Sequence, residues 1–224
     1  LKRGEVLALA GDNGAGKSTL IKIISGVYHQ DDGEMSYNGT NLKISNPKYA
    51  RNLGIETIYQ DLALADNLNV GANIFLGREP LLNLFGPVNI LDREKMLSES
   101  RQILESLDIE IPEFSLSQPV LRLSGGQRQA IAICRAIYWK AELLIMDEPT
   151  AALGVPEQRK VMQLISRLRK QNIAIILISH NLNDIFEIAD RIAILRQGRL
   201  VGDHMINGIN REEVVRLMVQ GNMA

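Results

Sequence analysis

The residues best suited to chemistry lie near the start of the chain, in the run Gly11-Asp12-Asn13-Gly14-Ala15-Gly16-Lys17-Ser18-Thr19. They fit the pattern G-x-x-x-x-G-K-[ST], whose glycines let backbone N–H groups approach phosphate oxygens without intervening side chains. Lys17 can neutralise the β- and γ-phosphates of a nucleotide, and the Ser18 hydroxyl can ligate Mg²⁺. The pattern therefore predicts a phosphate-binding loop.

Such a loop needs a strand before it and a helix after it, and the flanking residues indicate both. Residues 6–10 form a short apolar run, which predicts a buried strand. Apolar residues follow the loop at helical spacing as far as Val27, and Gly26 fits a helix end. This context disfavours the alternative of a chance glycine-rich turn.

Acidic residues and a histidine follow two other apolar runs. Residues 143–146 predict a buried parallel strand, which ends in Asp147-Glu148, and residues 173–179 predict a second one, followed by His180. Open α/β sheets place their chemistry at the carboxyl ends of strands. Alone, these residues would be ordinary strand-end turn residues; the phosphate-binding loop upstream favours a catalytic role.

A third candidate segment is Leu123-Ser124-Gly125-Gly126-Gln127, which precedes a helical run ending near Tyr138. Ser124 and Gln127 have capping-box spacing, so an ordinary capped helix is one interpretation. Two successive glycines weaken a helix start and are useful mainly where something approaches the backbone closely.

Composition restricts the class of protein. The chain has 224 residues, of which 46% are hydrophobic, enough for one large α/β domain or two small ones. The net charge of −1 gives no basic field for nucleic acid, and the single Cys134 excludes an internal disulfide. We see no signal peptide and no apolar run approaching ~18 residues, the length that spans a membrane. Because the chain starts with Leu1 rather than Met, we expect its natural N-terminus to lie upstream.

The remaining pattern divides the chain. Alternating residues around Asn38-Gly39 predict a small antiparallel β unit, and residues 54–59 predict a strand that ends at Gln60. Residues 61–140 read as a mostly helical insertion, with helices over 70–76 and 92–107 and a loop or broken segment over 81–91, where Pro80, Gly86 and Pro87 interrupt the pattern. Further elements are a helix from Pro156 to about 171, a helix over 181–189, a hairpin around Gln197-Gly198 and a terminal helix from Asn210.

With these motifs in order, the chain resembles the nucleotide-binding subunit of ATP-binding-cassette (ABC) transporters over essentially its whole length. Gly11 to Ser18 looks like the Walker A loop, and Gln60 stands where the family has its Q-loop glutamine. Residues 123–127 match the LSGGQ signature, and residues 143–148 match Walker B with its catalytic glutamate. His180 matches the switch histidine. The implied fold is an α/β P-loop NTPase core with a mostly parallel sheet, a small antiparallel β unit and a helical subdomain. The resemblance places the core in residues 1–60 and 141–224 and the helical signature subdomain in 61–140.

The resemblance also implies roles for these residues. Glu148 is the expected general base, His180 contacts the γ-phosphate, and Gln60 joins Ser18 and Asp147 as Mg²⁺ ligands. Gly11 through Thr19 would bind ATP within the chain, whereas Ser124, Gly125, Gly126 and Gln127 would face the ATP of a second ATPase subunit. The expected unit is a head-to-tail homodimer on transmembrane permease subunits.

Three segments resemble the sugar-import group of the ribose, xylose and fructose type: 66–70, 73–79 and 150–154. This implies import of a monosaccharide, an indirect partnership with a solute-binding protein, no nucleic acid, and a peripheral location at the cytoplasmic face of the inner (plasma) membrane. Two features depart from the family. Gly154 occupies a position where most members have the D-loop Asp, and the adenine-stacking aromatic is expected upstream of Leu1, since Tyr28 lies too far along the first helix.

Three alternatives remain at this stage. A non-transport ABC ATPase acting on DNA or ribosomes usually has a long coiled coil or a second cassette, which the sequence lacks. A P-loop kinase or GTPase would leave the segment 123–127 unexplained, and no N-K-x-D motif is present. A nucleotide-binding module without turnover is disfavoured by Glu148 and His180, but Gly154 leaves it open.

Overall fold

The computed structural model describes residues 1–85 and 88–221, which form two compact units. The core unit contains residues 1–60, 141–149 and 168–221, and the helical unit contains residues 61–140 and 150–167. The sequence interpretation assigns 150–167 to the core, but in the structure this stretch groups with the helical unit. One reason is Arg167, whose guanidinium donates to the carbonyl oxygen of Leu107 at 2.6 Å.

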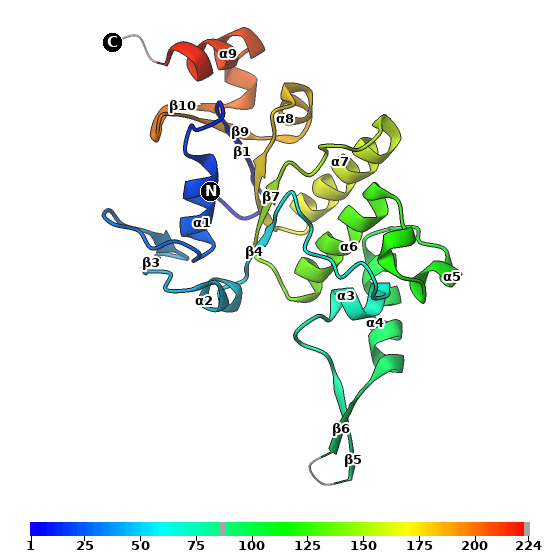
Figure 1. Cartoon of the computed structure of the whole chain (residues 1–224). Helices are drawn as coiled ribbons and strands as arrows, with labels where there is room; N and C mark the ends of the chain where they lie inside the picture. Colours follow the sequence, from blue (N-terminus) through cyan, green and yellow to red (C-terminus); the bar gives the residue numbers. More distant parts are fainter. Residues whose placement is uncertain (86–87, 222–224) are drawn as a thin grey trace. The chain divides into compact units, whose positions relative to one another are not determined.

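A six-stranded sheet forms the core unit (Figure 1). Its strand order is β10-β9-β1-β8-β7-β4, and every neighbouring pair is parallel except β9 with β10. The apolar runs that precede Asp147 and His180 form interior strands of this sheet. Four of their residues are fully buried: Leu144, Ile145, Met146 and Ile175. This sheet confirms the predicted fold class. The strands are β1 (Val6–Ala10), β4 (Ile55–Ile58), β7 (Leu143–Asp147), β8 (Ala174–Ile178), β9 (Arg191–Arg196) and β10 (Arg199–Met205).

Helices and a small hairpin complete the core unit. The predicted antiparallel β unit is present as a short hairpin whose Asn38-Gly39 turn has positive φ at both residues. Residues 47–52 form a helix that the sequence interpretation did not include; the Asn46 side chain caps it by accepting from the backbone N–H of Tyr49. The elements are β2 (Ser36–Tyr37), β3 (Thr40–Asn41), α1 (Lys17–Ile24), α2 (Pro47–Asn52), α8 (Leu182–Ile188), a 3₁₀ turn (Ile206–Gly208) and α9 (Arg211–Gln220).

The helical unit is built mainly from helices, as the pattern over 61–140 predicts. Asp92 caps the helix predicted over 92–107, and Ser124 with Gln127 forms a complete capping box at the start of the next long helix. The helices are α3 (Val70–Ile74), α4 (Arg93–Ser106), α5 (Glu113–Leu116), a 3₁₀ turn (Val120–Arg122), α6 (Gly125–Tyr138) and α7 (Val155–Lys170), of which the last three residues belong to the core unit.

One prediction for this unit is wrong. The segment 81–91, expected as a loop or broken stretch, contains the antiparallel strands β5 (Leu81–Phe85) and β6 (Val88–Leu91), which Figure 1 shows extending away from α3 and α4. Pro80 lies before the first strand residue, where its missing N–H costs no ladder bond. Gly86 and Pro87 lie outside the described residues.

The stretch that follows Gln60 is fixed by a buried amide of the helical unit. Asn73 on α3 is fully buried; its Oδ1 accepts from the backbone N–H of Ala65 at 2.7 Å, and its Nδ2 donates to the carbonyl oxygens of Ala65, Leu68 and Asn69 at 3.0–3.2 Å. A single side chain thus satisfies four backbone groups of a segment without regular structure. Among the described residues, no helix is long and apolar enough to cross a membrane.

Candidate functional site

The loop between β1 and α1 has the backbone shape that phosphate binding needs. Gly11, Gly14 and Gly16 all have positive φ, and a Cβ on Gly11 would lie 2.4 Å from the carbonyl oxygen of Leu195. Helix α1 starts at Lys17 without a side-chain cap, because Gly16 occupies the N-cap position. The uncapped N-terminus of α1 therefore leaves backbone donors and the positive end of the helix dipole available to an anion.

A hairpin distant in sequence supports this loop. The N–H of Gly198, in the turn between β9 and β10, donates to the carbonyl oxygen of Ala15 at 2.9 Å. A Cβ on Gly16 would lie 3.3 Å from the Cα of Gly198. The sequence interpretation treated the Gln197-Gly198 turn as an ordinary hairpin, and only the sheet order, which places β9 beside β1, reveals this role.

Lys17 is held inside the loop. Its ammonium group donates to the carbonyl oxygens of Gly11 at 2.5 Å and Asp12 at 3.1 Å, and the residue is only 8% exposed. Burial lowers the pKa of Lys17, while the negative charges of Glu148, Asp147 and Asp12 act in the opposite direction. These hydrogen bonds keep the Lys17 ammonium group pointing into the loop.

The two carboxylates lie across the same cavity from Lys17. Asp147 ends β7 in register with Ile178 of β8, and the backbone N–H of Glu148 donates to the carbonyl oxygen of Ile178 at 2.9 Å. Glu148 adopts a left-handed conformation with φ of 56°, unusual for a residue other than glycine. Strain of this kind is found where the surrounding structure fixes a side chain for function.

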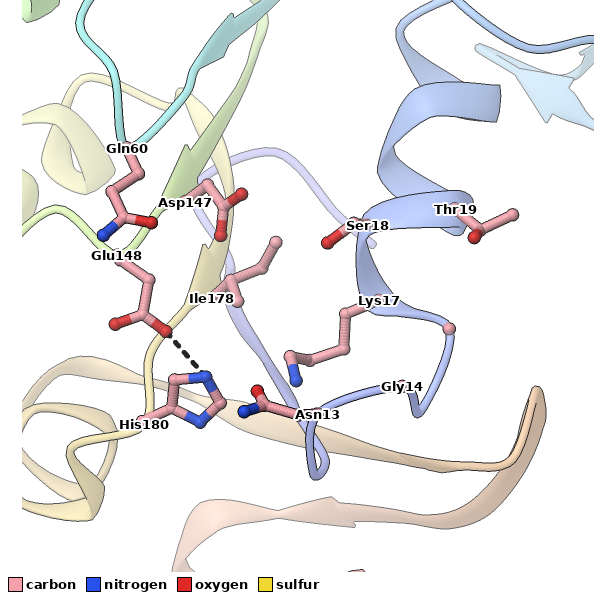
Figure 2. A pocket seen from close by; sticks show the side chains of 11 residues that line it. Asn13, Gly14, Lys17, Ser18, Thr19, Gln60, Asp147, Glu148, Ile178 and His180 are labelled. Atoms are coloured by element: carbon pink, nitrogen blue, oxygen red, sulfur yellow. Dashed lines mark ion pairs between the residues drawn. The ribbon is translucent and has the colours of Figure 1, made fainter.

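His180 completes this cluster from the end of β8. Its Nε2 lies 3.0 Å from Oε1 of Glu148, the ion pair marked in Figure 2. Burial raises the pKa of Glu148, with Asp147 adding to the effect and His180 and Lys17 opposing it. Burial also raises the pKa of Asp147, against the nearby charges of Lys17 and His180.

These side chains line one cavity of about 420 Å³ in the core unit. Figure 2 shows Lys17 and Ser18 on one side and Gln60, Asp147 and Glu148 on the other. Ile178, which the sequence interpretation treated only as strand core, also contributes; its register with Asp147 is the signal that could have identified it. The predicted residues at the cavity wall are Asn13, Gly14, Gly16, Lys17, Ser18, Thr19, Gln60, Asp147, Glu148 and His180.

The donor set fits Mg²⁺ bound together with a phosphate. Magnesium prefers oxygen ligands and usually takes one or two carboxylates plus substrate phosphates rather than a cage made of protein alone. Ser18, Gln60 and Asp147 offer a hydroxyl, an amide and a carboxylate at one cavity. No cluster of three or more His, Cys, Asp or Glu residues suited to a metal occurs in the part of the chain that the structure describes.

The predicted signature residues lie in the helical unit. Ser124, Gly126 and Gln127 line a separate cavity there, and the Ser124 side chain accepts from the backbone N–H of Gln127 at 3.3 Å. The Gln127 side chain accepts in return from the N–H of Ser124 at 3.0 Å. The helix start thus retains the backbone amides of its two glycines as a surface for an anion.

Comparison with known proteins agrees with this geometry. The family described as ABC transporter matches residues 1–151. The xylose/arabinose import ATP-binding protein of Sulfolobus acidocaldarius is 47% identical over 218 residues, covering 97% of this chain and 84% of that protein. A ribose import ATP-binding protein of Caldanaerobacter subterraneus subsp. tengcongensis is 43% identical over 219 residues, covering 98% of this chain but only 43% of the relative.

Solved structures support the fold separately. A nucleotide-free ATP-binding cassette from an ABC transporter superposes with a TM-score of 0.80 at 22% identity, covering 98% of this chain and 85% of that one. At that identity the likeness concerns the fold alone. The family match and the 47% identity to the Sulfolobus acidocaldarius protein establish that this chain belongs to the ABC transporter family.

Proposed function

We propose that this chain binds ATP and hydrolyses it to drive the import of a monosaccharide. The observation that supports this best is the cavity that combines a phosphate-binding loop with Glu148 paired to His180. A module that only binds nucleotide has no need of a strained, desolvated carboxylate opposite the phosphate loop.

ATP binding in this proposal depends on the loop and on α1. The loop glycines and the N-terminus of α1 hold the phosphate groups through backbone N–H groups. Lys17 exchanges the carbonyl oxygens of Gly11 and Asp12 for the β- and γ-phosphate oxygens. Mg²⁺, bound by Ser18, Gln60 and Asp147 with phosphate oxygens, would offset the negative charge of the β- and γ-phosphates.

Hydrolysis then requires a base and a group that stabilises charge. Glu148 accepts a proton from a water molecule whose oxygen attacks the γ-phosphorus, the bond to the β-phosphate oxygen breaks, and ADP leaves with that electron pair. The raised pKa of Glu148 strengthens it as a base. His180, 3.0 Å from Glu148, is placed to hold the γ-phosphate as negative charge shifts during the reaction.

The proposed sugar and the proposed partners are inferred from the relatives. The two relatives described above are named as ATP-binding proteins for import of xylose or arabinose and of ribose. We therefore propose transmembrane permease subunits and a second ATPase subunit as direct partners, a solute-binding protein as an indirect one, and a peripheral place at the cytoplasmic face of the membrane. The sugar-import relatives disfavour the alternative of an ABC ATPase that remodels DNA or ribosomes.

The decisive experiment has two stages. Purified chain with Mg²⁺-ATP should release phosphate, and absence of release would end the ATPase assignment. The chain should then be reconstituted with its permease in proteoliposomes, with labelled xylose, arabinose, ribose and fructose offered with the solute-binding protein. Import of one of these sugars that depends on ATP supports the proposal, and export or no transport of any of them contradicts it.

A further inference from the structure

The loop 150–154, which follows β7 and Glu148 in sequence, is held by hydrogen bonds from the first turns of α7. The side-chain amide of Gln158 donates to the carbonyl oxygens of Leu153 at 3.0 Å and Thr150 at 3.4 Å, and its backbone N–H donates to the carbonyl oxygen of Gly154 at 2.9 Å. One residue therefore fixes the loop at three carbonyl groups. The exposed surface of the loop includes Ala151, Ala152 and Gly154.

The same loop and helix lie against the two glycines at the start of α6. A Cβ on Gly125 would lie 2.8 Å from Cδ2 of Leu153, and a Cβ on Gly126 would lie 3.0 Å from both Cβ and Cγ of Glu157. A side chain at Gly125 would therefore force Leu153 to move, and one at Gly126 would be tightly packed against Glu157. The glycines that the sequence interpretation linked to a close approach are thus approached by the chain itself.

Glu157 also explains why residue 154 can be glycine. A Cβ built on Gly154 would lie 2.8 Å from Oε2 of Glu157, while the next nearest atoms are 3.8 Å away. That distance is only slightly longer than the separation between Cβ and the carboxylate oxygens within an aspartate. The Glu157 oxygen is therefore near enough to Gly154 to occupy space that the side chain of an aspartate at position 154 would need. Gly154 has no positive φ, so its backbone does not require glycine.

We infer that Glu157 is a positioning residue, which supplies from α7 a carboxylate beside position 154, where the resemblance to the ABC family implies an aspartate in most members. In the proposed ATP-bound dimer, the start of α6 faces the second copy of this chain. The loop 150–154 lies beside the start of α6, because Leu153 packs against Gly125. The Glu157 carboxylate then accepts a hydrogen bond from the second copy and links closure of one nucleotide site to the other. This inference rests on the proposed function and adds a residue to it.

A carboxylate in the first turn of α7 also has an ordinary role, since an acidic residue stabilises a helix N-terminus. Glu157 is three residues after Gly154, whose carbonyl oxygen accepts the first bond of the helix, so it stands at the capping-box position. Glutamine serves that position equally well. Glu157→Gln therefore keeps the cap and its shape while it removes the charge, which separates the two roles.

The experiment compares the parent with Glu157→Gln, Gly154→Asp and the double variant, each in two backgrounds. In the Glu148→Gln background, light scattering measures dimerisation with Mg²⁺-ATP; in the otherwise unchanged chain, phosphate release against ATP concentration gives the Hill coefficient. Because hydrogen bonds to charged groups are the strong ones, Glu157→Gln should weaken the ATP-dependent dimer by about 10-fold and lower the Hill coefficient towards one. Gly154→Asp alone should also weaken it, because two carboxylates then compete for one place.

The double variant decides the matter, because its aspartate restores a carboxylate where Glu157→Gln removed one. Recovery of the dimer and of the Hill coefficient supports the inference, and failure to recover overturns it, as does a Glu157→Gln variant that dimerises like its parent. Glu94→Gln, which removes an exposed carboxylate from the first turn of α4, is the matched control and should change neither. Melting temperatures identify any variant that is merely unstable. If the unchanged chain releases no phosphate, the proposed function fails instead.

Discussion

Glu148 Oε1 lies 3.0 Å from Nε2 of His180, although the two residues follow different strands of the sheet. β7 and β8 are parallel neighbours, with Asp147 opposite Ile178, so the residues just beyond their carboxyl ends meet. The contact between Glu148 and His180 is therefore a consequence of the register between β7 and β8. A shift of one residue in either strand would separate the carboxylate from the imidazole and turn alternate side chains to the other face of the sheet.

Glu148→Gln should reduce the rate of ATP hydrolysis by roughly 10²–10⁴-fold, because an amide of similar shape cannot accept the proton of the attacking water. ATP affinity should be retained, since the phosphate loop is unchanged. Phosphate release and calorimetric ATP titration measure the two quantities. The exposed Glu187 on α8 offers a matched control, and Glu187→Gln should hydrolyse ATP at the parent rate. Turnover at the parent rate in Glu148→Gln would remove Glu148 from the mechanism.

Lys17→Ala should instead weaken ATP binding itself, because the ammonium group contacts bound phosphate before any reaction. Loss of a charge-assisted hydrogen bond predicts a rise in the ATP dissociation constant on the order of 10–100-fold. Lys22→Ala, in the last turn of the same helix, is the control and should leave the constant unchanged. An unchanged dissociation constant for Lys17→Ala would contradict the expected role of the loop.

Stability should depend on pH through the carboxyl group of Glu148. Its pKa is raised in the folded chain above the ordinary value of 4.5, so the folded state binds its proton more tightly than the unfolded state does. The stabilisation of the folded state by this tighter proton binding is present below pH 4.5 and is lost as the pH rises through the folded pKa of Glu148. Glu148→Gln should therefore melt at a higher temperature than the parent at neutral pH, and the difference should shrink as the pH falls towards 4.5. Equal melting temperatures at every pH would show that the charged carboxylate of Glu148 does not destabilise the folded chain.

Gly11→Ala should destabilise the core unit, because the added Cβ would lie 2.4 Å from the carbonyl oxygen of Leu195 and 2.9 Å from Cβ of Ala15. Overpacking together with an unfavourable φ predicts a loss of about 3 kcal/mol in the free energy of unfolding. For a chain of this size that corresponds to a fall of roughly 6–12 °C in melting temperature. Gly208→Ala is the control, since its Cβ would enter open space and its φ is not positive. A small effect at Gly11 would mean that the loop can move away from β9.

Asn73→Asp should destabilise the helical unit by roughly 3 kcal/mol, because a carboxylate cannot donate to the carbonyl oxygens of Ala65, Leu68 and Asn69 and would bury a charge beside them. Asn69→Asp is a closely matched control. The Asn69 side chain caps α3 by accepting from the N–H of Ala72, which aspartate does equally well. Urea unfolding followed by circular dichroism measures both, and two equal curves would speak against the role of Asn73.

Much of the fold could be predicted because short-range chemistry decides it. The hairpin at Asn38-Gly39 follows from residues that tolerate positive φ, and α4 begins where Asp92 can cap it. The strand-end residues Asp147, Glu148 and His180 could be placed at one site because the carboxyl ends of parallel strands share an edge of the sheet. Each of these predictions uses information within a few residues of the element.

The errors arise where pairing overrides local preference. Residues 81–91 lack alternation because Leu81 pairs with Leu91 and Leu82 with Ile90, so apolar side chains occur on both faces of the hairpin. All four side chains are more than 40% exposed, which a binary pattern does not encode. The role of Glu157 beside Gly126 was equally invisible, since it depends on how α6 and α7 approach each other.

The sheet order has a consequence for synthesis of the chain. β1 precedes in sequence both strands to which it is hydrogen-bonded, β8 and β9, and the turn that supports Ala15 contains Gly198. A ribosome that has translated the chain only as far as residue 150 has produced the phosphate loop without either neighbour of its strand. Long sequence separations of this kind slow folding, because the loop-closure entropy must be overcome before the contacts form. Nucleotide can therefore stabilise the loop of the nascent chain only after β8 and β9 have been translated, and β1 lacks both of its neighbours until then.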